Sequence, residues 1–198
     1  MEFKEGASVI TTDDKVAGRL SRVVIDPQTN QVTHIVIQKG LLDKIDLVID
    51  VQNIGAASPE KVTLLCTADD IRSMPPFVIT QYTSAQDQSD SSMPGLYPNT
   101  LLTPPPPIAE TNRSIPEQLI ALKEGAPVFS VDQEHVGNVK RVITDPEDGQ
   151  VKRFIIAKGL LLKENKSIPF AWVDVLGEEK VSLTVDSQQV KDLPGFPE

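Results

Sequence analysis

The residue types that most often carry catalysis are scarce in this chain of 198 residues. It has two histidines, His34 and His135, and a single cysteine, Cys66. Enzymatic chemistry needs a nucleophile with a base, a paired acid and base, or metal ligands at fixed spacing. The acidic pair Asp13-Asp14 lies in a short polar stretch, which indicates a solvated turn. These residues alone therefore predict no catalytic group and no metal site.

A long internal repeat strengthens that conclusion. Shifted by 119 positions, the chain aligns with itself without a gap from Lys4 to Phe77, and Lys4-Glu5-Gly6-Ala7 recurs as Lys123-Glu124-Gly125-Ala126. A duplicated catalytic or metal site would keep its histidine in both copies. In this alignment His34 faces an arginine and His135 faces a valine. We therefore expect two surface or turn histidines, a protein that is not an enzyme, and no cofactor.

The surface feature that best fits a binding role is an apolar loop that also occurs twice. In each copy a lysine and a glycine precede consecutive leucines, and consecutive exposed apolar side chains usually mark a contact site. An alternative is that the leucines close the end of a barrel or form the contact between the two repeats. The candidate partner-binding residues are Lys39, Gly40, Leu41, Leu42, Lys158, Gly159, Leu160, Leu161 and Leu162.

Each loop follows a predicted hairpin with the same turn chemistry in both copies. Aspartate starts the turn, proline fixes φ at the next position, and the fifth residue can adopt the left-handed conformation. That fifth residue is asparagine in one copy and glycine in the other, the two types that adopt this conformation most readily. The structural turn residues are therefore Asp26, Pro27 and Asn30, with Asp145, Pro146 and Gly149 in the second copy.

The remaining pattern of each copy is typical of short strands. The strand after the turn is apolar on both faces at its centre, as in Ile35-Val36-Ile37, which indicates cover on both sides. A further β segment is predicted from Ile168 to Val173. A short helix closes each copy, because Thr67 to Asp70 resembles a capping box and Pro75 follows it. About six strands in some 75 residues predict a small closed barrel in each copy, so the fold class is mainly β.

The chain thus divides into two tandem barrels and a linker. We predict repeat 1 at residues 1–77, a Pro/Ser-rich linker at 78–114 and repeat 2 at 115–198. The linker has little to bury and is expected to behave as a coil. Its run Pro104 to Pro107 favours polyproline II, either as a semi-rigid spacer or as a docking motif for a partner.

Charge and apolar content exclude several other classes of protein. The net charge is −9, and repeat 1 to residue 75, the middle segment and the remainder each sum to −3. Nucleic-acid binding depends on clustered lysine and arginine, so this even negative charge disfavours it and we expect no direct contact with nucleic acid. No apolar run approaches the roughly 18–20 residues of a membrane span. We expect a cytoplasmic protein in which Cys66 packs as a small apolar residue of a strand.

Several of these motifs together resemble the PRC-barrel domain family. They are Lys-Glu-Gly-Ala-x-Val, then Gly18-Arg19-Leu20-x-x-Val23-Val24-x-Asp26-Pro27, then Val32-x-x-Ile35-Val36-Ile37-x-x-Gly40, each with a counterpart in the second copy. The resemblance implies six-stranded barrels that act as protein-interaction modules. The family's best-known members are the photosynthetic reaction-centre H subunit and the ribosome-maturation factor RimM. This chain has neither the membrane helix of the first nor the N-terminal domain of the second.

The resulting functional prediction is an adaptor or assembly module for another, unidentified protein. One alternative is a ribosome- or RNA-processing-associated factor that binds a basic ribosomal protein. Another is a stress protein that binds a small ligand in a cleft lined by Phe170 and Trp172. Small domains are marginal on their own, so we also expect the two repeats to pack together as a pseudo-twofold pair.

Overall fold

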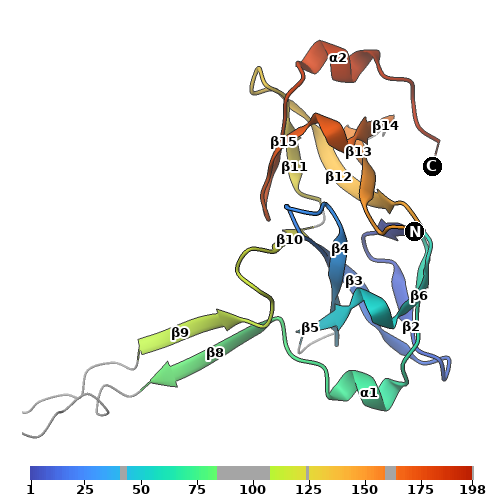
Figure 1. Ribbon diagram of the computed structural model, residues 1–198, viewed down its shortest axis with the longest axis vertical. Helices are drawn as coiled ribbons and strands as arrows, with labels where there is room; N and C mark the ends of the chain where they lie inside the picture. The colour runs from blue at the N-terminus through green and yellow to red at the C-terminus, as the bar shows by residue number, and fades with distance from the viewer. Residues whose placement is uncertain (41–43, 84–107, 124, 159–163, 198) are drawn as a thin grey trace, which may run out of the picture.

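The computed structural model describes residues 1–40, 44–83, 108–123, 125–158 and 164–197. It consists of two similar β-rich lobes and a two-stranded ribbon that projects from them (Figure 1). The predicted fold class, mainly β with two small barrels and a short helix after each, is confirmed. In the described residues no helix has the length and apolarity to cross a membrane.

Each lobe is built from six strands of its own repeat. In repeat 1 these are β2 (Ser8–Ile10), β3 (Val16–Ile25), β4 (Val32–Lys39), β5 (Ile45–Asp50), β6 (Ile54–Ala57) and β7 (Lys61–Leu64), in the spatial order β5-β4-β3-β2-β7-β6. In repeat 2 they are β11 (Pro127–Phe129), β12 (His135–Thr144), β13 (Val151–Lys158), β14 (Glu164–Pro169), β15 (Val173–Leu176) and β16 (Val181–Leu183), in the matching order β14-β13-β12-β11-β16-β15.

Glycine allows the long strands β3 and β12 to curl closely around their neighbours. A Cβ atom on Gly18 would lie 2.5 Å from the carbonyl oxygen of Gln38 in β4. At the equivalent position, Gly137 has a φ of 152°, and a Cβ there would lie 2.9 Å from the Ala157 carbonyl oxygen. Any larger residue would push the paired strands apart, so both copies keep glycine at this bend.

A seventh strand in each sheet comes from the other repeat. Strand β1 (Glu2–Lys4) pairs antiparallel with β12 of repeat 2, and β10 (Ile120–Lys123) pairs antiparallel with β3 of repeat 1. The exchange is reciprocal and keeps the same register in both directions. The two repeats therefore pack together, as expected, but through exchanged strands that the sequence pattern does not reveal.

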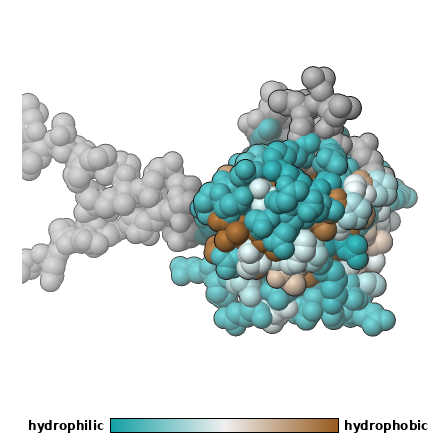
Figure 2. All heavy atoms as spheres, turned by 90° about the horizontal axis from the view of Figure 1, so that it is seen from above, coloured by the Kyte–Doolittle hydropathy of each residue, from teal (hydrophilic) through white to brown (hydrophobic). Residues whose placement is uncertain are grey.

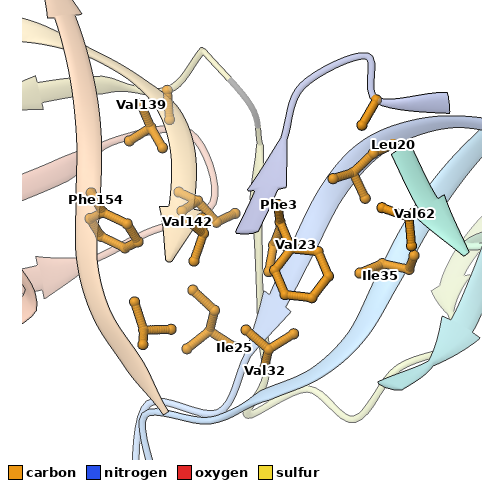
Figure 3. Packing of buried hydrophobic residues seen from close by; sticks show 14 of the residues in the cluster. Phe3, Leu20, Val23, Ile25, Val32, Ile35, Val62, Val139, Val142 and Phe154 are labelled. Atoms are coloured by element: carbon orange, nitrogen blue, oxygen red, sulfur yellow. The ribbon is translucent and has the colours of Figure 1, made fainter. Parts of the chain in front are cut away.

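One continuous apolar core fills both lobes and the junction between them. Its members include Leu20, Val23 and Ile35 from repeat 1, and Val139, Val142 and Phe154 from repeat 2. Figure 3 shows Phe3 of β1 lying between these two groups. A smaller cluster covers the outer face of the repeat 1 sheet, with members Val24, Val36, Val48, Phe77, Ile115, Leu119 and Ala121.

A short α-helix closes each repeat, as the capping motifs predict. Helix α1 (Ala68–Arg72) begins after Thr67, whose side chain and that of Asp70 form a reciprocal capping box. Helix α2 (Ser187–Asp192) has the same arrangement between Asp186 and Gln189. Each box satisfies amide groups that a helix of this length would otherwise leave without partners.

The single strand predicted from Ile168 to Val173 is wrong. Strand β14 ends at Pro169, which has no amide hydrogen for the ladder, and Phe170–Trp172 form the 3₁₀ helix η3 before β15 begins. Repeat 1 has the same interruption, the 3₁₀ helix η1 (Val51–Asn53) between β5 and β6. The helical turn redirects the chain to the opposite edge of the sheet, which a continuous strand could not do.

The expectation of a coil throughout residues 78–114 is also wrong. Strands β8 (Val78–Thr83) and β9 (Ile108–Arg113) pair antiparallel, from Val78 opposite Arg113 to Thr83 opposite Ile108. The two ends of the segment therefore meet, and they do not hold the repeats at a distance. The proline run from Pro104 to Pro107 lies outside the described residues.

Candidate functional site at the junction of the two repeats

The crossing between the lobes occurs at the repeated Lys-Glu-Gly-Ala motif. After β1, the Ala7 amide donates to the Lys4 carbonyl oxygen at 3.1 Å, and Gly6 has a φ of 69°. In repeat 2 the Ala126 amide donates to the Lys123 carbonyl oxygen at 3.2 Å, and Gly125 has a φ of 73°. This left-handed conformation favours glycine, so the motif produces a tight turn that returns the chain to its own barrel.

The exchanged strands insert a large apolar side chain into the other repeat. Phe3 lies opposite Val142, and Leu122 lies opposite Val23. Phe3 and Leu122 are each only 2% exposed. The Met1 amino group also donates to the Thr144 carbonyl oxygen at 3.0 Å, which fixes the start of β1 on repeat 2. The junction is thus a buried apolar contact framed by backbone hydrogen bonds.

The two predicted turns meet each other on the other side of the junction. Asn30 has a φ of 59° and Gly149 a φ of 70°. The carbonyl oxygen of each accepts a hydrogen bond from the opposite repeat. The Val151 amide donates to Asn30 at 2.8 Å, and the Val32 amide donates to Gly149 at 3.2 Å. The Gln31 side chain donates to the Asp148 carbonyl oxygen at 2.8 Å. These turns therefore contribute to the contact between the repeats as well as shaping their own hairpins.

In each turn, the aspartate side chain stabilises the loop by a hydrogen bond to a backbone amide of the same loop. Asp26 accepts a hydrogen bond from the Gln28 amide at 2.8 Å, and Asp145 accepts one from the Glu147 amide at 2.9 Å. The bond from the Glu147 amide lowers the pKa of Asp145. Pro27 and Pro146 occupy the exposed position between donor and acceptor, as their fixed φ allows.

An arginine from each repeat lies beside the exchanged strand, and the two have different surroundings. The Arg22 guanidinium lies 5.3 Å from the centre of the Phe77 ring, donates to the Ala121 carbonyl oxygen at 3.3 Å and approaches Glu179 at 3.9 Å. Its counterpart Arg141 is only 8% exposed. Among the described residues, no ion pair or hydrogen bond of the Arg141 side chain is found.

An open hollow of about 320 Å³ adjoins Arg22 at this junction. It is lined by polar groups from both repeats, among them Glu5, Arg19, Arg22, Gln38, Asp46 and Lys123. The cleft predicted around Phe170 and Trp172 does not coincide with it. Phe170 packs edge-on against Phe154 with the ring centres 5.3 Å apart, and Trp172 packs against the main core.

The predicted partner-binding loops are described only at their starts. Lys39 ends β4 opposite Ile45, and Gly40 follows with a φ of 90°. Lys158 ends β13 and lines a small hollow of about 80 Å³ together with Lys166 and Lys191. Gly159 and the leucines Leu41, Leu42, Leu160, Leu161 and Leu162 lie outside the described residues.

Asp13 is a structural residue and not only part of a solvated turn. Its carboxylate accepts hydrogen bonds from the Thr11 hydroxyl at 2.7 Å and the Ala68 amide at 3.0 Å, and it pairs with Lys15 at 2.9 Å. The Thr11 hydrogen bond is the main reason that the pKa of Asp13 lies far below its usual value. The carboxylate therefore ties the turn between β2 and β3 to the first residue of α1.

Repeat 2 has the same contact between the turn aspartate and the start of the helix. Asp132 accepts hydrogen bonds from the Ser187 amide at 3.0 Å and the Ser187 hydroxyl at 2.9 Å. Its pKa is lowered, first by a hydrogen bond from Ser130. The signal in the sequence was the recurrence of this aspartate at the repeat offset, together with the helix start that it binds.

The residue types with catalytic potential lie apart from one another. His34 contacts the Thr33 hydroxyl at 3.0 Å in repeat 1, and His135 contacts Asn138 at 2.8 Å in repeat 2. Cys66 follows β7 and packs partly buried against the core, and this burial raises the pKa of its thiol. Within the described ranges, no three side chains of metal-binding type come together.

These features define the class of protein as a pair of small β-barrels joined by reciprocal strand exchange. The family model of the PRC-barrel domain matches residues 5–69 and again residues 123–189, so the chain belongs to the PRC-barrel family and contains the domain twice. The predicted resemblance is therefore confirmed. A search of curated proteins found no match. Strand β1 and part of β10 precede the two matched ranges.

Proposed function

We propose that this tandem PRC-barrel protein is a non-catalytic adaptor or assembly module that binds another protein. The observation that carries the proposal is the way both barrels are joined to the base of the β8–β9 ribbon. A ribbon held by two barrels presents its strands in a fixed direction, which suits a binding surface better than a connection between domains.

Contacts from both repeats hold this base. The Ser114 amide donates to the Phe77 carbonyl oxygen at 3.1 Å, and its hydroxyl donates to Pro76. Arg113, at the end of β9, forms an ion pair with Glu178 of repeat 2. Ile115 then packs in the smaller cluster on repeat 1. The base of the ribbon is therefore held by contacts to both repeats, and the ribbon projects away from them (Figure 1).

The ribbon also provides backbone groups that a partner can pair with. In the described part of the chain, β8 pairs only with β9, so each strand has one open edge. Open edges accept an additional strand from another protein. The apolar loops that begin at Lys39-Gly40 and Lys158-Gly159 are the second proposed surface, since consecutive leucines follow the glycine in both repeats.

Among the described residues, few large apolar side chains are exposed. Figure 2 shows the end of the molecule that carries α2 as mostly hydrophilic, with small hydrophobic areas between. The exposed large apolar residues of the described chain are single side chains such as Val16 and Val131, at 66% and 58%. Scattered residues of this kind do not mark an interface, so they serve as matched controls for the loops.

The test is capture of proteins from the cells that make this chain, on the tagged full-length protein, at low and high salt. We expect a retained protein that resists salt, and that is lost when Leu41, Leu42, Leu160 and Leu161 are all replaced by serine. Replacement of Val16 and Val131 by serine should leave it bound. Loss in both variants, or in neither, would contradict the leucine surface.

The same experiment examines the ribosome-associated alternative. The net charge of −9 suits a basic partner, and such a complex dissociates as ionic strength rises because exposed charges are screened. Ribosomal proteins that are retained only at low salt would replace the adaptor proposal with that alternative. No retained protein at either salt would leave the adaptor proposal without support and direct the search to small ligands of the junction hollow.

A further inference from the structure

We propose that the junction also accepts a second copy of this chain, so that repeat 1 of one molecule pairs with repeat 2 of another in a closed, strand-exchanged dimer. The geometry points to this because, in the described residues, the two lobes are joined by strand and turn pairs that each link one repeat to the other. They are β1 with β12, β10 with β3, and the contact between the two hairpin turns. This inference is independent of the proposed adaptor role.

The pairing is self-complementary in the sense that a twofold dimer requires. Phe3 faces Val142 as Leu122 faces Val23, and Lys4 faces Arg141 as Lys123 faces Arg22. Each repeat both gives a strand and receives one. Two chains that exchange partners can therefore satisfy every such contact and leave neither β3 nor β12 unpaired at the junction, as domain-swapped dimers do.

The connection between the repeats is the only part that must change its path. The segment 114–123 belongs with repeat 1 in either form, because Ile115, Leu119 and Ala121 pack on the repeat 1 sheet and β10 pairs with β3. This leaves residues 78–113 as the hinge. At about 3.3 Å per extended residue the segment can reach roughly 120 Å, which is several times the width of a small domain. When the ribbons of both molecules open, β8 of each chain can pair with β9 of the other.

The balance between the two forms depends on concentration. Both forms contain the same inter-repeat contacts, so they differ chiefly in whether the connection closes within one chain or between two. A covalent connection of this length keeps linked partners at an effective concentration of roughly millimolar. The closed monomer therefore predominates at micromolar concentration, and the dimer becomes populated when chains are brought together at about millimolar local concentration.

The test uses one cysteine on each side of the junction. Glu2 and Ile143 are directly opposite in the β1–β12 pair and both are partly exposed. Neighbours in an antiparallel pair have Cα atoms about 4.5–5.5 Å apart, which suits a disulfide. One full-length chain carries Glu2→Cys and the other, of different size through a tag, carries Ile143→Cys. Both also carry Cys66→Ala. Equal amounts are unfolded together, refolded at about 10 µM or 1 mM, and oxidised.

The expected result is a disulfide between the two different chains that forms at the higher concentration and rises roughly in proportion to it. The background is the cross-link that each single-cysteine chain forms with its own kind. Cross-linking between different chains no greater than this background at 1 mM would overturn the dimer. A chain with both cysteines, refolded at the lower concentration, should cross-link within itself. If it does not, the strand exchange itself is wrong and the inference fails with it.

Discussion

Truncating Phe3 gives the most direct measure of what the exchanged strand contributes. The side chain is 2% exposed and belongs to the core shared by the two repeats. Phe→Ala at such a site removes the transfer free energy of the ring and leaves a cavity, at a cost of about 3–5 kcal/mol. Phe3→Leu, which introduces the residue type that repeat 2 has at the equivalent Leu122, should cost only about 1–1.5 kcal/mol.

Denaturant unfolding of the full-length chain measures this loss. The midpoint should fall with Phe3→Ala, in one cooperative transition, because the lobes share a core. Val131→Ala is the matched control, since that side chain is 58% exposed and should change the free energy of unfolding by less than about 0.5 kcal/mol. A loss below about 1 kcal/mol for Phe3→Ala would show that β1 is peripheral, contrary to its burial.

Hydrogen exchange then identifies the barrel to which β1 belongs. The structure pairs Glu2–Lys4 with residues 141–143 of β12, so Phe3→Ala should accelerate amide exchange there before it affects repeat 1. Leu122→Ala should act in the opposite direction, on residues 22–25 of β3. If Phe3→Ala instead loosens residues 22–25, the strand lies in its own repeat and the exchange is refuted.

Three further predictions concern a glycine of β3, the Asp13 carboxylate and the β8–β9 ribbon. Gly18→Ala should cost about 1–3 kcal/mol, since the new methyl group overlaps a backbone oxygen, whereas Gly195→Ala meets no atom within 4 Å and should be nearly neutral in the same thermal unfolding assay. Because the pKa of Asp13 is lowered on folding, its stabilising effect is complete above about pH 4 and is lost as the pH falls below it. Denaturant titrations from pH 2 to 7 should therefore show a weaker pH dependence for Asp13→Asn, and an unchanged slope would contradict the assigned hydrogen bonds. Replacing residues 84–107 by Asn-Gly should preserve the fold, since this turn suits a two-residue hairpin loop between strands that already pair at Thr83, and a large drop in the unfolding midpoint would count against the ribbon.

Local features of the fold could be predicted because local chemistry determines them. The turn that contains Asn30 in one repeat and Gly149 in the other requires a left-handed residue, and only a few residue types supply one cheaply. The capping box at Thr67 is likewise a contact between residues three positions apart. The repeat offset showed that both features occur twice, which made the barrel prediction secure.

The choice of partner for β1 could not be predicted in this way. Phe3 would fill an apolar site equally well in either barrel, and an alternating pattern gives the face of a strand but not the sheet that receives it. The decision depends on how two whole lobes fit together across a long connection. The ribbon was missed for a different reason. Its strands border a segment rich in serine and proline, and that composition dominated the prediction for the entire linker.

The reciprocal exchange has a consequence for how the chain is made. The Met1 amino group and its acceptor in Thr144 are 143 positions apart, and the Arg22 side chain and the Ala121 carbonyl are 99 apart. At roughly 5–20 residues per second, the ribosome needs at least several seconds after it has finished β3 to supply the strand that completes the first sheet. During that interval the edge of β3 is open to any strand nearby. The first barrel cannot complete its sheet before β10 has been translated, so maturation of the first half of the chain depends on residues at the start of the second.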